Sequence, residues 1–229
     1  MTHPEALALL RQAPLFSGLS EPALAGLAAH LRRRTFRRGT MIFHKDQAGD
    51  ALYIIDTGRV RIFLPRESGG ELTVEVASRG EVFGELALLD GGPRSASAES
   101  LDDVVLWTIS RADFTQTVQT TPQLAVALIE LLSRRLRHVT EYAESLAFLD
   151  VHARLAQRLL ELGERDGVRR GEAIEISFDL TQTDLATMVG ATRERVNRAL
   201  ASFRAQGLIE LRGRTIVLLD PARLRRRVY

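Results

Sequence analysis

The fold of this chain is decided by the stretch Phe83-Gly84-Glu85-Leu86-Ala87-Leu88-Leu89-Asp90-Gly91-Gly92-Pro93-Arg94-Ser95-Ala96. A glycine leads a carboxylate into a short apolar helical turn, and a Gly-Gly-Pro break then precedes an arginine beside a serine. Backbone N–H groups at a helix start, a hydroxyl and one guanidinium are the groups that bind a phosphodiester with a single negative charge. The stretch therefore predicts an anion-binding turn.

The carboxylate of Glu85 restricts which anion can bind there. It would repel a phosphate unless it accepted a hydrogen bond from a hydroxyl of the same ligand, and a ribose 2′-OH is such a donor. The predicted ligand set in this stretch is Gly84, Glu85, Leu86, Arg94 and Ser95, forming a small pocket for a cyclic ribonucleotide. The alternative is a surface loop in which Arg94 and Glu85 form an ion pair.

Length and composition set the broad class of protein. A chain of 229 residues favours two domains, and 45% hydrophobic with 26% charged residues is typical of globular proteins. The absence of cysteine excludes disulfides, thiolate zinc sites and Cys-ligated iron–sulfur clusters, and no metal site is expected. No signal peptide or membrane span is evident, so we expect a cytoplasmic protein without a membrane partner. No nucleophile–base pair or Gly-rich nucleotide loop stands out, so an enzyme is not expected.

Charge is distributed unevenly along the chain. Residues 1–150 carry 16 Arg and Lys against 19 Asp and Glu, a net charge of −3, whereas residues 151–229 carry 15 against 10, a net charge of +5. A basic C-terminal part behind a mildly acidic N-terminal part indicates that only the former contacts nucleic acid.

The spacing of apolar residues in the N-terminal half changes at about Thr35. Residues 4–31 have helical spacing, and Ser20-Glu21-Pro22 reads as the start of a helix that runs to about Leu31. Short apolar runs punctuated by glycines then predict strands of a sandwich or jelly-roll barrel, which the helical turn interrupts. These runs are 41–43, 51–55, 60–64, 72–76 and 104–109.

A long helix is predicted from Pro122 to Leu149. Apolar residues recur on it at alternating steps of three and four, and they are Ile129, Leu132, Leu136, Val139, Ala143 and Leu146. Such a seam usually buries itself against a copy of itself, which predicts a parallel homodimer. Leu124, Leu128 and Leu131 form a flank expected to face the barrel. The alternative is that the seam itself packs onto the barrel of its own chain.

The C-terminal part has the pattern of two helices and a hairpin. We expect Asp150 to cap a helix over 151–162, followed by a charged loop over 163–171 and a strand over 173–178. Thr181 and Asp184 have capping-box spacing, and Thr192 caps the next helix. The small residue Ala186, the turn residue Gly190 and the branched residue Val196 have the spacing of a helix-turn-helix. The run 208–219 is expected to form a hairpin after it.

Three stretches together resemble the Crp/Fnr superfamily of bacterial transcription regulators, in the cyclic AMP receptor branch. They are the 83–96 stretch, the hinge Leu146-Ala147-Phe148-Leu149-Asp150-Val151 and the helix start Thr192-Arg193-Glu194-Arg195-Val196-Asn197-Arg198. The resemblance implies an α+β fold in three parts. These are a cyclic-nucleotide-binding jelly roll over residues 1–121, a dimerisation helix with its hinge over 122–149, and a winged helix-turn-helix DNA-binding domain over 150–229. It also implies RNA polymerase as a partner.

The resemblance assigns the base-reading residues to Arg193, Glu194 and Arg198. An arginine can donate to guanine O6 and N7, and a glutamate can accept from cytosine N4, when both lie at the start of a recognition helix. The implied ligand is a double-stranded palindromic operator of the TGTGA type. Phosphate contacts are expected from Thr181, Gln182, Thr192, Arg195 and Arg214.

One departure from the family concerns the base of the nucleotide. Adenine-recognising members carry two consecutive hydroxyl residues on the long helix, and the corresponding positions here are Val139 and Thr140. Cyclic AMP is the expected effector, although a missing hydrogen-bonding partner can weaken discrimination between bases. The alternatives are a ligand-independent regulator of the same family, a cyclic-nucleotide-binding module of an enzyme or channel, and a haem sensor that uses His3 or His44.

Overall fold

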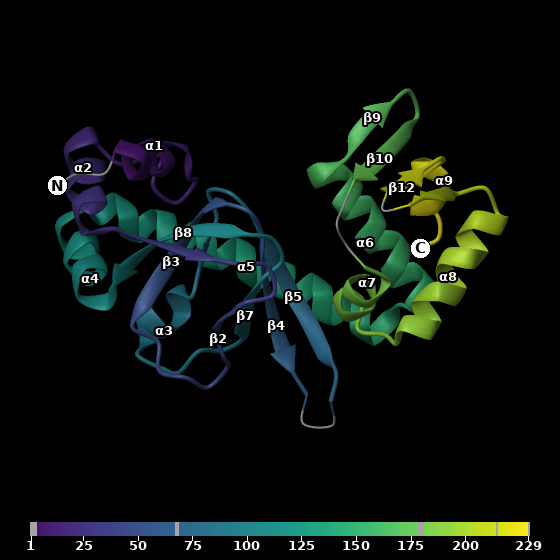
Figure 1. Ribbon diagram of the computed structural model, residues 1–229, viewed down its shortest axis with the longest axis horizontal. Coiled ribbons are helices and arrows are strands. Elements are labelled where there is room, and N and C mark those ends of the chain that lie inside the picture. The colour runs from purple at the N-terminus through teal and green to yellow at the C-terminus, as the bar shows by residue number, and fades with distance from the viewer. Residues whose placement is uncertain (1–3, 67–68, 178–180, 214, 229) are drawn as a thin grey trace. The chain divides into compact units, whose positions relative to one another are not determined.

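A computed structural model describes residues 4–66, 69–177, 181–213 and 215–228 (Figure 1). The chain divides into two compact units, one formed by residues 1–65 and 74–138 and the other by residues 66–73 and 139–229. Over the described ranges, no helix combines the length and the apolar character needed to cross a membrane.

The first unit contains two four-stranded antiparallel sheets. One has the order β1-β8-β3-β6 and the other the order β2-β7-β4-β5. Their strands are β1 (Arg32–Phe36), β2 (Met41–Phe43), β3 (Ala51–Thr57), β4 (Val60–Pro65), β5 (Glu71–Ala77), β6 (Val82–Phe83), β7 (Ser97–Ser100) and β8 (Val104–Ser110). Buried residues from both sheets form one apolar cluster, so the sheets pack against each other as the predicted barrel.

Residues 51–55 of strand β3 are all apolar because both faces of the strand are buried there. Tyr53 and Ile55 belong to the cluster between the two sheets, whereas Leu52 and Ile54 belong to a second cluster formed with helices. Successive side chains of a strand point to opposite faces of the sheet. Residues 52–55 therefore lie alternately in the cluster packed against the helices and in the cluster between the two sheets.

Helices cover the second face of that sheet. They are α1 (Pro4–Gln12), α2 (Glu21–His30), α4 (Arg111–Thr120) and the first half of α5 (Pro122–Phe148). Leu124 and Leu128 of α5 are buried in this cluster, and Leu131 packs against it, as predicted for the flank that faces the barrel. Helix α2 begins where the sequence predicts, but Ser20 makes no side-chain capping hydrogen bond.

The second unit holds the predicted winged helix-turn-helix. Its helices are α6 (Val151–Asp166), α7 (Gln182–Met188), α8 (Arg193–Ala205) and α9 (Pro221–Arg225). Its sheet has the order β11-β12-β10-β9, with β9 (Val168–Arg170), β10 (Ala173–Ser177), β11 (Ile209–Arg212) and β12 (Thr215–Leu218). Asp150 caps α6 by accepting from the Ala153 N–H over 2.8 Å, as predicted.

Two sequence predictions fail here. Helix α6 continues to Asp166 instead of ending at Leu162, and the expected loop 163–171 contains strand β9. Gly163 is a packing residue and not a helix end, because a Cβ there would lie 3.1 Å from Leu218 Cδ1. The sequence also does not predict strands β1 and β7, since their sequences RRRTF and SAES lack apolar runs.

Candidate functional site

The 83–96 stretch folds into a tight turn and a short helix in the first unit. Gly84 has a φ of +77° and precedes helix α3 (Glu85–Asp90), which Gly91 ends with a φ of +76°. A Cβ on Gly84 would lie 2.6 Å from Nη1 of Arg94, so the backbone approaches the guanidinium more closely than any other residue type would allow. The turn is therefore built around Arg94.

Arg94 is a buried cation held by backbone carbonyls. Its side chain donates from Nη1 to the Gly84 carbonyl over 2.7 Å and from Nη2 to the Ala51 carbonyl over 2.8 Å. The guanidinium lies 4.3 Å from the centre of the Phe43 ring, and the residue is 3% exposed. Burial lowers the pKa of Arg94 from its ordinary value.

No carboxylate among the described residues forms an ion pair with Arg94, and its Nε is buried without a hydrogen-bond partner there. A buried charge without a counter-ion is costly, so this position favours an anion. Gly84 and Arg94 therefore form one side of a site for a negatively charged ligand.

Glu85 is also buried, at 2% exposure, but it has a partner that the sequence did not indicate. Arg135 of α5 forms a close ion pair with Glu85 through Nη1 and donates from Nη2 to the Val82 carbonyl over 2.6 Å. Burial lowers the pKa of Arg135, but the combined effect of the nearby carboxylates raises it above the ordinary value. A sequence signal existed, because Arg135 continues the stripe of Leu124, Leu128 and Leu131 by one further helical step.

Glu75 of β5 is a third charged group beside this pair. Its Oε2 lies 3.5 Å from Nε of Arg135, and its side chain is 28% exposed. Burial raises the pKa of Glu75, and the attraction of Arg135 offsets this only in part. Its position in strand β5 gave no sign of the contact in the sequence.

Arg111, which the sequence did not single out either, supports the turn from the start of α4. Its Nη2 donates to the carbonyl of Gly49 over 3.0 Å and to the carbonyl of Ala87. These bonds join the end of the loop before β3 to helix α3. Arg111 is therefore a structural group of the turn.

The other predicted ligand residues are accessible. Leu86 is 43% exposed, and Ser95 is exposed next to Arg94. Val139, at 47% exposure, and Thr140, also exposed, lie on the part of α5 that belongs to the second unit. Of the predicted set, the structure brings Gly84, Glu85, Leu86, Arg94 and Ser95 together in the first unit.

The second candidate site is the helix-turn-helix. Thr181 and Asp184 form the predicted capping box, with the Thr181 N–H donating to Asp184 Oδ2 over 2.6 Å and the Asp184 N–H donating to Thr181 Oγ1 over 3.2 Å. Thr192 caps α8 by accepting from the Arg195 N–H over 3.4 Å. The turn between the two helices contains Gly190, whose φ of +62° favours glycine.

Helix α8 has one buried face and one exposed basic face. Val196, Ala199, Leu200 and Phe203 are buried, whereas Arg193, Glu194, Arg195 and Arg198 are exposed in its first two turns. Over the described ranges, none of these three arginines has an ion-pair partner. Arg193, Glu194 and Arg198 therefore lie exposed together at the start of α8, as predicted residues of a recognition helix must. Gln182 begins α7, and the predicted phosphate contact Arg214 lies outside the described residues.

The helix-turn-helix is anchored to the hinge by two side chains that the sequence did not single out. The Tyr142 hydroxyl donates to the Met188 carbonyl over 3.0 Å, and Nε of Arg154 donates to the Val189 carbonyl over 2.9 Å. Arg154 also donates from Nη1 to the Leu149 carbonyl over 2.6 Å. These bonds satisfy the carbonyls at the end of α7, which have no partner within their own helix.

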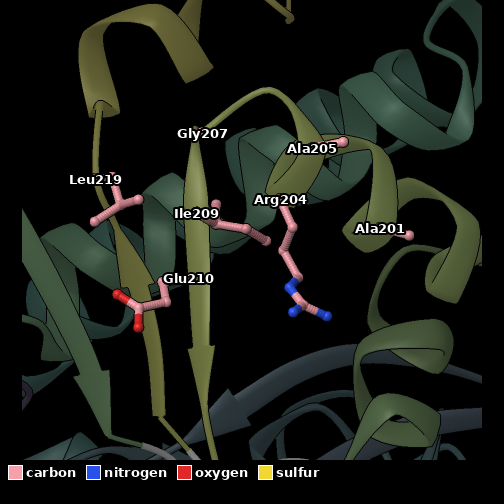
Figure 2. A pocket seen from close by; sticks show the side chains of 7 residues that line it. All are labelled: Ala201, Arg204, Ala205, Gly207, Ile209, Glu210 and Leu219. Atoms are coloured by element: carbon pink, nitrogen blue, oxygen red, sulfur yellow. The ribbon is translucent and has the colours of Figure 1, made fainter.

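An open groove of about 510 Å³ lies on the same unit, at the opposite end of α8 from Arg193, Glu194 and Arg198 (Figure 2). It is lined by Ala201, Arg204, Ala205, Gly207, Ile209, Glu210 and Leu219. Figure 2 shows the Arg204 side chain extending from α8 alongside β11. None of the predicted ligand or DNA contacts lines this groove.

The first unit holds a buried arginine without a carboxylate partner among the described residues, and the second holds a helix-turn-helix whose second helix exposes basic residues. Residues 33–121 match the family model of the cyclic nucleotide-binding domain, and residues 153–227 match that of the Crp-like helix-turn-helix domain. The chain belongs to the Crp/Fnr family of transcription regulators, which are not enzymes.

Relatives of nearly the same length support this assignment. A CRP-like cAMP-activated global transcriptional regulator of Mycobacterium tuberculosis is 36% identical over 96% of this chain and 98% of its own length. The cyclic AMP receptor protein of Thermus thermophilus is 33% identical over 94% and 96%. Among solved structures, the c-di-GMP responsive regulator CLP of Xanthomonas campestris is 28% identical with a TM-score of 0.78, over 88% of this chain and 100% of that one.

Proposed function

We propose that this protein is a homodimeric transcription regulator whose affinity for a palindromic operator is controlled by a cyclic nucleotide, with cyclic AMP as the effector. The observation that carries the proposal is Arg94, a buried guanidinium without a carboxylate partner in the described part of the chain. A cyclic phosphodiester supplies one negative charge, which matches this one cation. The names of the Mycobacterium and Thermus relatives, both linked to cyclic AMP, support adenine as the base.

The homodimer is supported by the exposed seam of α5. Ile129 and Leu136 are 64% and 69% exposed, and Val139 and Leu146 are 47% and 38% exposed. Apolar residues that recur at steps of three and four and face solvent in a single chain are typical of a helix that pairs with a copy of itself. We propose that residues 122–149 form this dimerisation helix between a sensor domain, 1–121, and a DNA-binding domain, 150–229.

In the proposed mechanism, Arg94 and Ser95 hold the phosphate, and Glu85 accepts from the ribose 2′-OH. The dimer presents two copies of α8 to half-sites about one DNA turn apart, where Arg193, Glu194 and Arg198 read base edges. Thr181, Gln182, Thr192, Arg195 and Arg214 contact phosphates, and RNA polymerase is the partner at the promoter. Ligand control requires that the nucleotide bind the DNA-competent state more tightly than the other state.

The test combines calorimetry with DNA-binding isotherms. Cyclic AMP should bind the purified protein at one site per chain and raise its affinity for a TGTGA-type palindrome. Cyclic GMP and cyclic di-GMP serve as competing ligands, the latter because of the Xanthomonas neighbour. Tight operator binding that no nucleotide changes would instead identify a ligand-independent regulator, a candidate favoured by the fact that Glu85 is already paired with Arg135.

A further inference from the structure

The sheet of the second unit has two edge strands that differ in character. Its order is β11-β12-β10-β9, so β11 and β9 each pair with a neighbour on one side only. Strand β9 carries the exposed residues Arg169 and Arg170, and charged side chains on an edge discourage pairing with another chain. Strand β11 instead carries the apolar residues Ile209 and Leu211. Strand β11 is therefore the edge that is better suited to accept a further strand.

The register of β11 shows which of its backbone groups point to the free edge. The Leu219 N–H donates to the Leu208 carbonyl over 2.9 Å, and the next pair is Ile209 opposite Leu218. Hydrogen-bonded and non-hydrogen-bonded pairs alternate along an antiparallel ladder, so the N–H and C=O groups of Ile209 and Leu211 point away from β12. Within the described ranges, neither residue makes a backbone hydrogen bond on that side. Ile209 is only 2% exposed, and a buried backbone polar group without a partner is costly.

The groove at the end of α8 adjoins this edge. Ile209 lines it together with three residues of α8, which are Ala201, Arg204 and Ala205. Figure 2 shows the Arg204 side chain on the side of β11 opposite to Leu219. The groove volume of about 510 Å³ is within the usual range of binding sites. A segment that paired with β11 would therefore place its side chains in this groove.

Arg204 defines the charge of the segment that fits. It is exposed and forms no ion pair with any residue in the described part of the chain. The acidic residue of the groove, Glu210, is already paired with Arg212 over 2.7 Å. An acidic side chain would complement Arg204 with a charge-assisted hydrogen bond, and a small apolar side chain would pack against Ala201 and Ala205.

A peptide matches this surface better than a nucleic acid does. The edge of β11 presents both N–H donors and C=O acceptors, and a peptide backbone supplies the complementary set of both. Phosphate oxygens supply acceptors only and would leave the carbonyls without a donor. The apolar groove wall formed by Ala201, Ala205 and Ile209 also disfavours a phosphate.

We propose that β11 and the adjoining groove bind an extended acidic segment of a partner protein, which adds to the sheet as a further strand and pairs an acidic side chain with Arg204. The inference goes beyond the proposed function and does not depend on it. None of its residues belongs to the proposed nucleotide site, and none is a predicted DNA contact.

The test uses synthetic peptides and the full-length protein. A fluorescent peptide of alternating valine and glutamate with blocked ends is titrated by anisotropy, beside the same peptide with lysine in place of glutamate. The glutamate peptide should bind about five-fold more tightly, because Arg204 attracts it and repels the lysine peptide. Methylation of every backbone nitrogen of the glutamate peptide should weaken binding about ten-fold, because the peptide can no longer donate to β11.

Two charge-reversal variants locate the binding site. Arg204→Glu should reverse the preference, so that the lysine peptide binds more tightly than the glutamate peptide. Arg223→Glu is the matched control, because Arg223 is an exposed arginine of α9 that does not line the groove. This control should retain the wild-type preference for glutamate.

Hydrogen exchange identifies the edge that the peptide occupies. The bound glutamate peptide should slow exchange at the amides of Ile209 and Leu211 about ten-fold, because their N–H groups become hydrogen-bonded. The amides of Arg169 and Arg170 on the opposite edge should exchange at an unchanged rate.

Several results would overturn the proposal. They are equal binding of the two peptides, no binding of either up to ~1 mM, and an Arg204→Glu variant that keeps the preference for glutamate. Unchanged exchange at Ile209 and Leu211 with the peptide bound would show that it binds elsewhere. If a DNA duplex protects these two amides and the peptide does not, the groove belongs to the DNA interface instead.

Discussion

Arg135 of helix α5 and Glu85 at the start of α3 form an ion pair in which the carboxylate is almost completely buried. The pair joins the long helix directly to the turn that surrounds Arg94. Any ligand group that approaches Glu85 must therefore share it with Arg135 or displace it. The part of α5 that carries Arg135 is therefore in direct contact with the turn.

The first prediction concerns this ion pair. Arg135→Gln should lower the free energy of unfolding by about 3–5 kcal/mol, because it leaves the buried Glu85 carboxylate without its cation. Arg134→Gln is the matched control, since Arg134 is exposed and lies 3.9 Å from the exposed Glu130, and it should cost less than about 1 kcal/mol. Urea unfolding of both variants provides the measurement. Equal losses would show that Arg135 is no more than a surface charge.

The second prediction concerns the phosphate. Arg94→Leu should abolish calorimetric binding of cyclic AMP with the fold retained, because it removes the buried cation proposed to hold the phosphate, and each charge-assisted bond is worth ~1.5–3 kcal/mol. Arg59→Leu, which breaks an ion pair with Asp102 elsewhere in the first unit, should bind as the wild type does. Unchanged affinity in Arg94→Leu would refute the anion site.

The third prediction concerns the base and the long helix. Val139→Thr should tighten cyclic AMP binding or raise its preference over cyclic GMP by about one net hydrogen bond, ~0.5–1.5 kcal/mol. Val139→Ala provides the control for the loss of the valine methyl groups. An unaltered ratio of the two affinities in the threonine variant would mean that the base is not read from position 139.

The fourth prediction is a pH dependence. The pKa of Glu75 is raised above 4.5 in the folded protein, so its contribution to stability is full below pH 4.5 and is lost as pH rises through the raised pKa. Charged groups around it are Arg135, Glu81, Glu85 and His138. Glu75→Gln cannot ionise, so its melting temperature should rise relative to the wild type as pH increases. A difference between the two that is constant from about pH 4 to pH 8 would contradict the raised pKa.

The fifth prediction separates base reading from phosphate binding on α8. Arg198→Ala should cost ~1–3 kcal/mol on the correct operator and relax selectivity at one base pair in each half-site. Arg195→Ala should weaken all sequences about equally and lower the salt slope by roughly one unit for each DNA phosphate that the variant no longer neutralises. Binding isotherms over a panel of operator mutants at several salt concentrations measure both. If Arg195→Ala alters selectivity and Arg198→Ala does not, the two roles are exchanged.

Local patterns determined much of this fold from the sequence alone. Apolar runs bounded by glycines predicted β2, β3, β4, β5 and β8, because a half-buried or fully buried strand needs apolar side chains wherever it meets a core. The helix caps at Asp150, Thr181 and Thr192 were predictable because each side chain accepts from an otherwise unpaired backbone N–H three residues later in the chain. The two helices of the DNA-binding unit followed from the same short-range rules.

Only the tertiary structure decided what surrounds the turn. Arg135, Glu75 and Arg111 reach it from three separate elements, α5, β5 and α4. Arg135 continues an apolar helical stripe, but nothing in the sequence identifies the partner of any of the three. Gly163 resembles a helix end because glycine often follows the last turn of a helix, whereas here it admits Leu218 at close range. The sequence alone thus predicted which residues bind a phosphodiester and which read DNA. The three-dimensional packing decided that Arg94 has no carboxylate partner among the described residues, whereas Glu85 is already paired with Arg135. Both facts depend on which side chains the fold brings together.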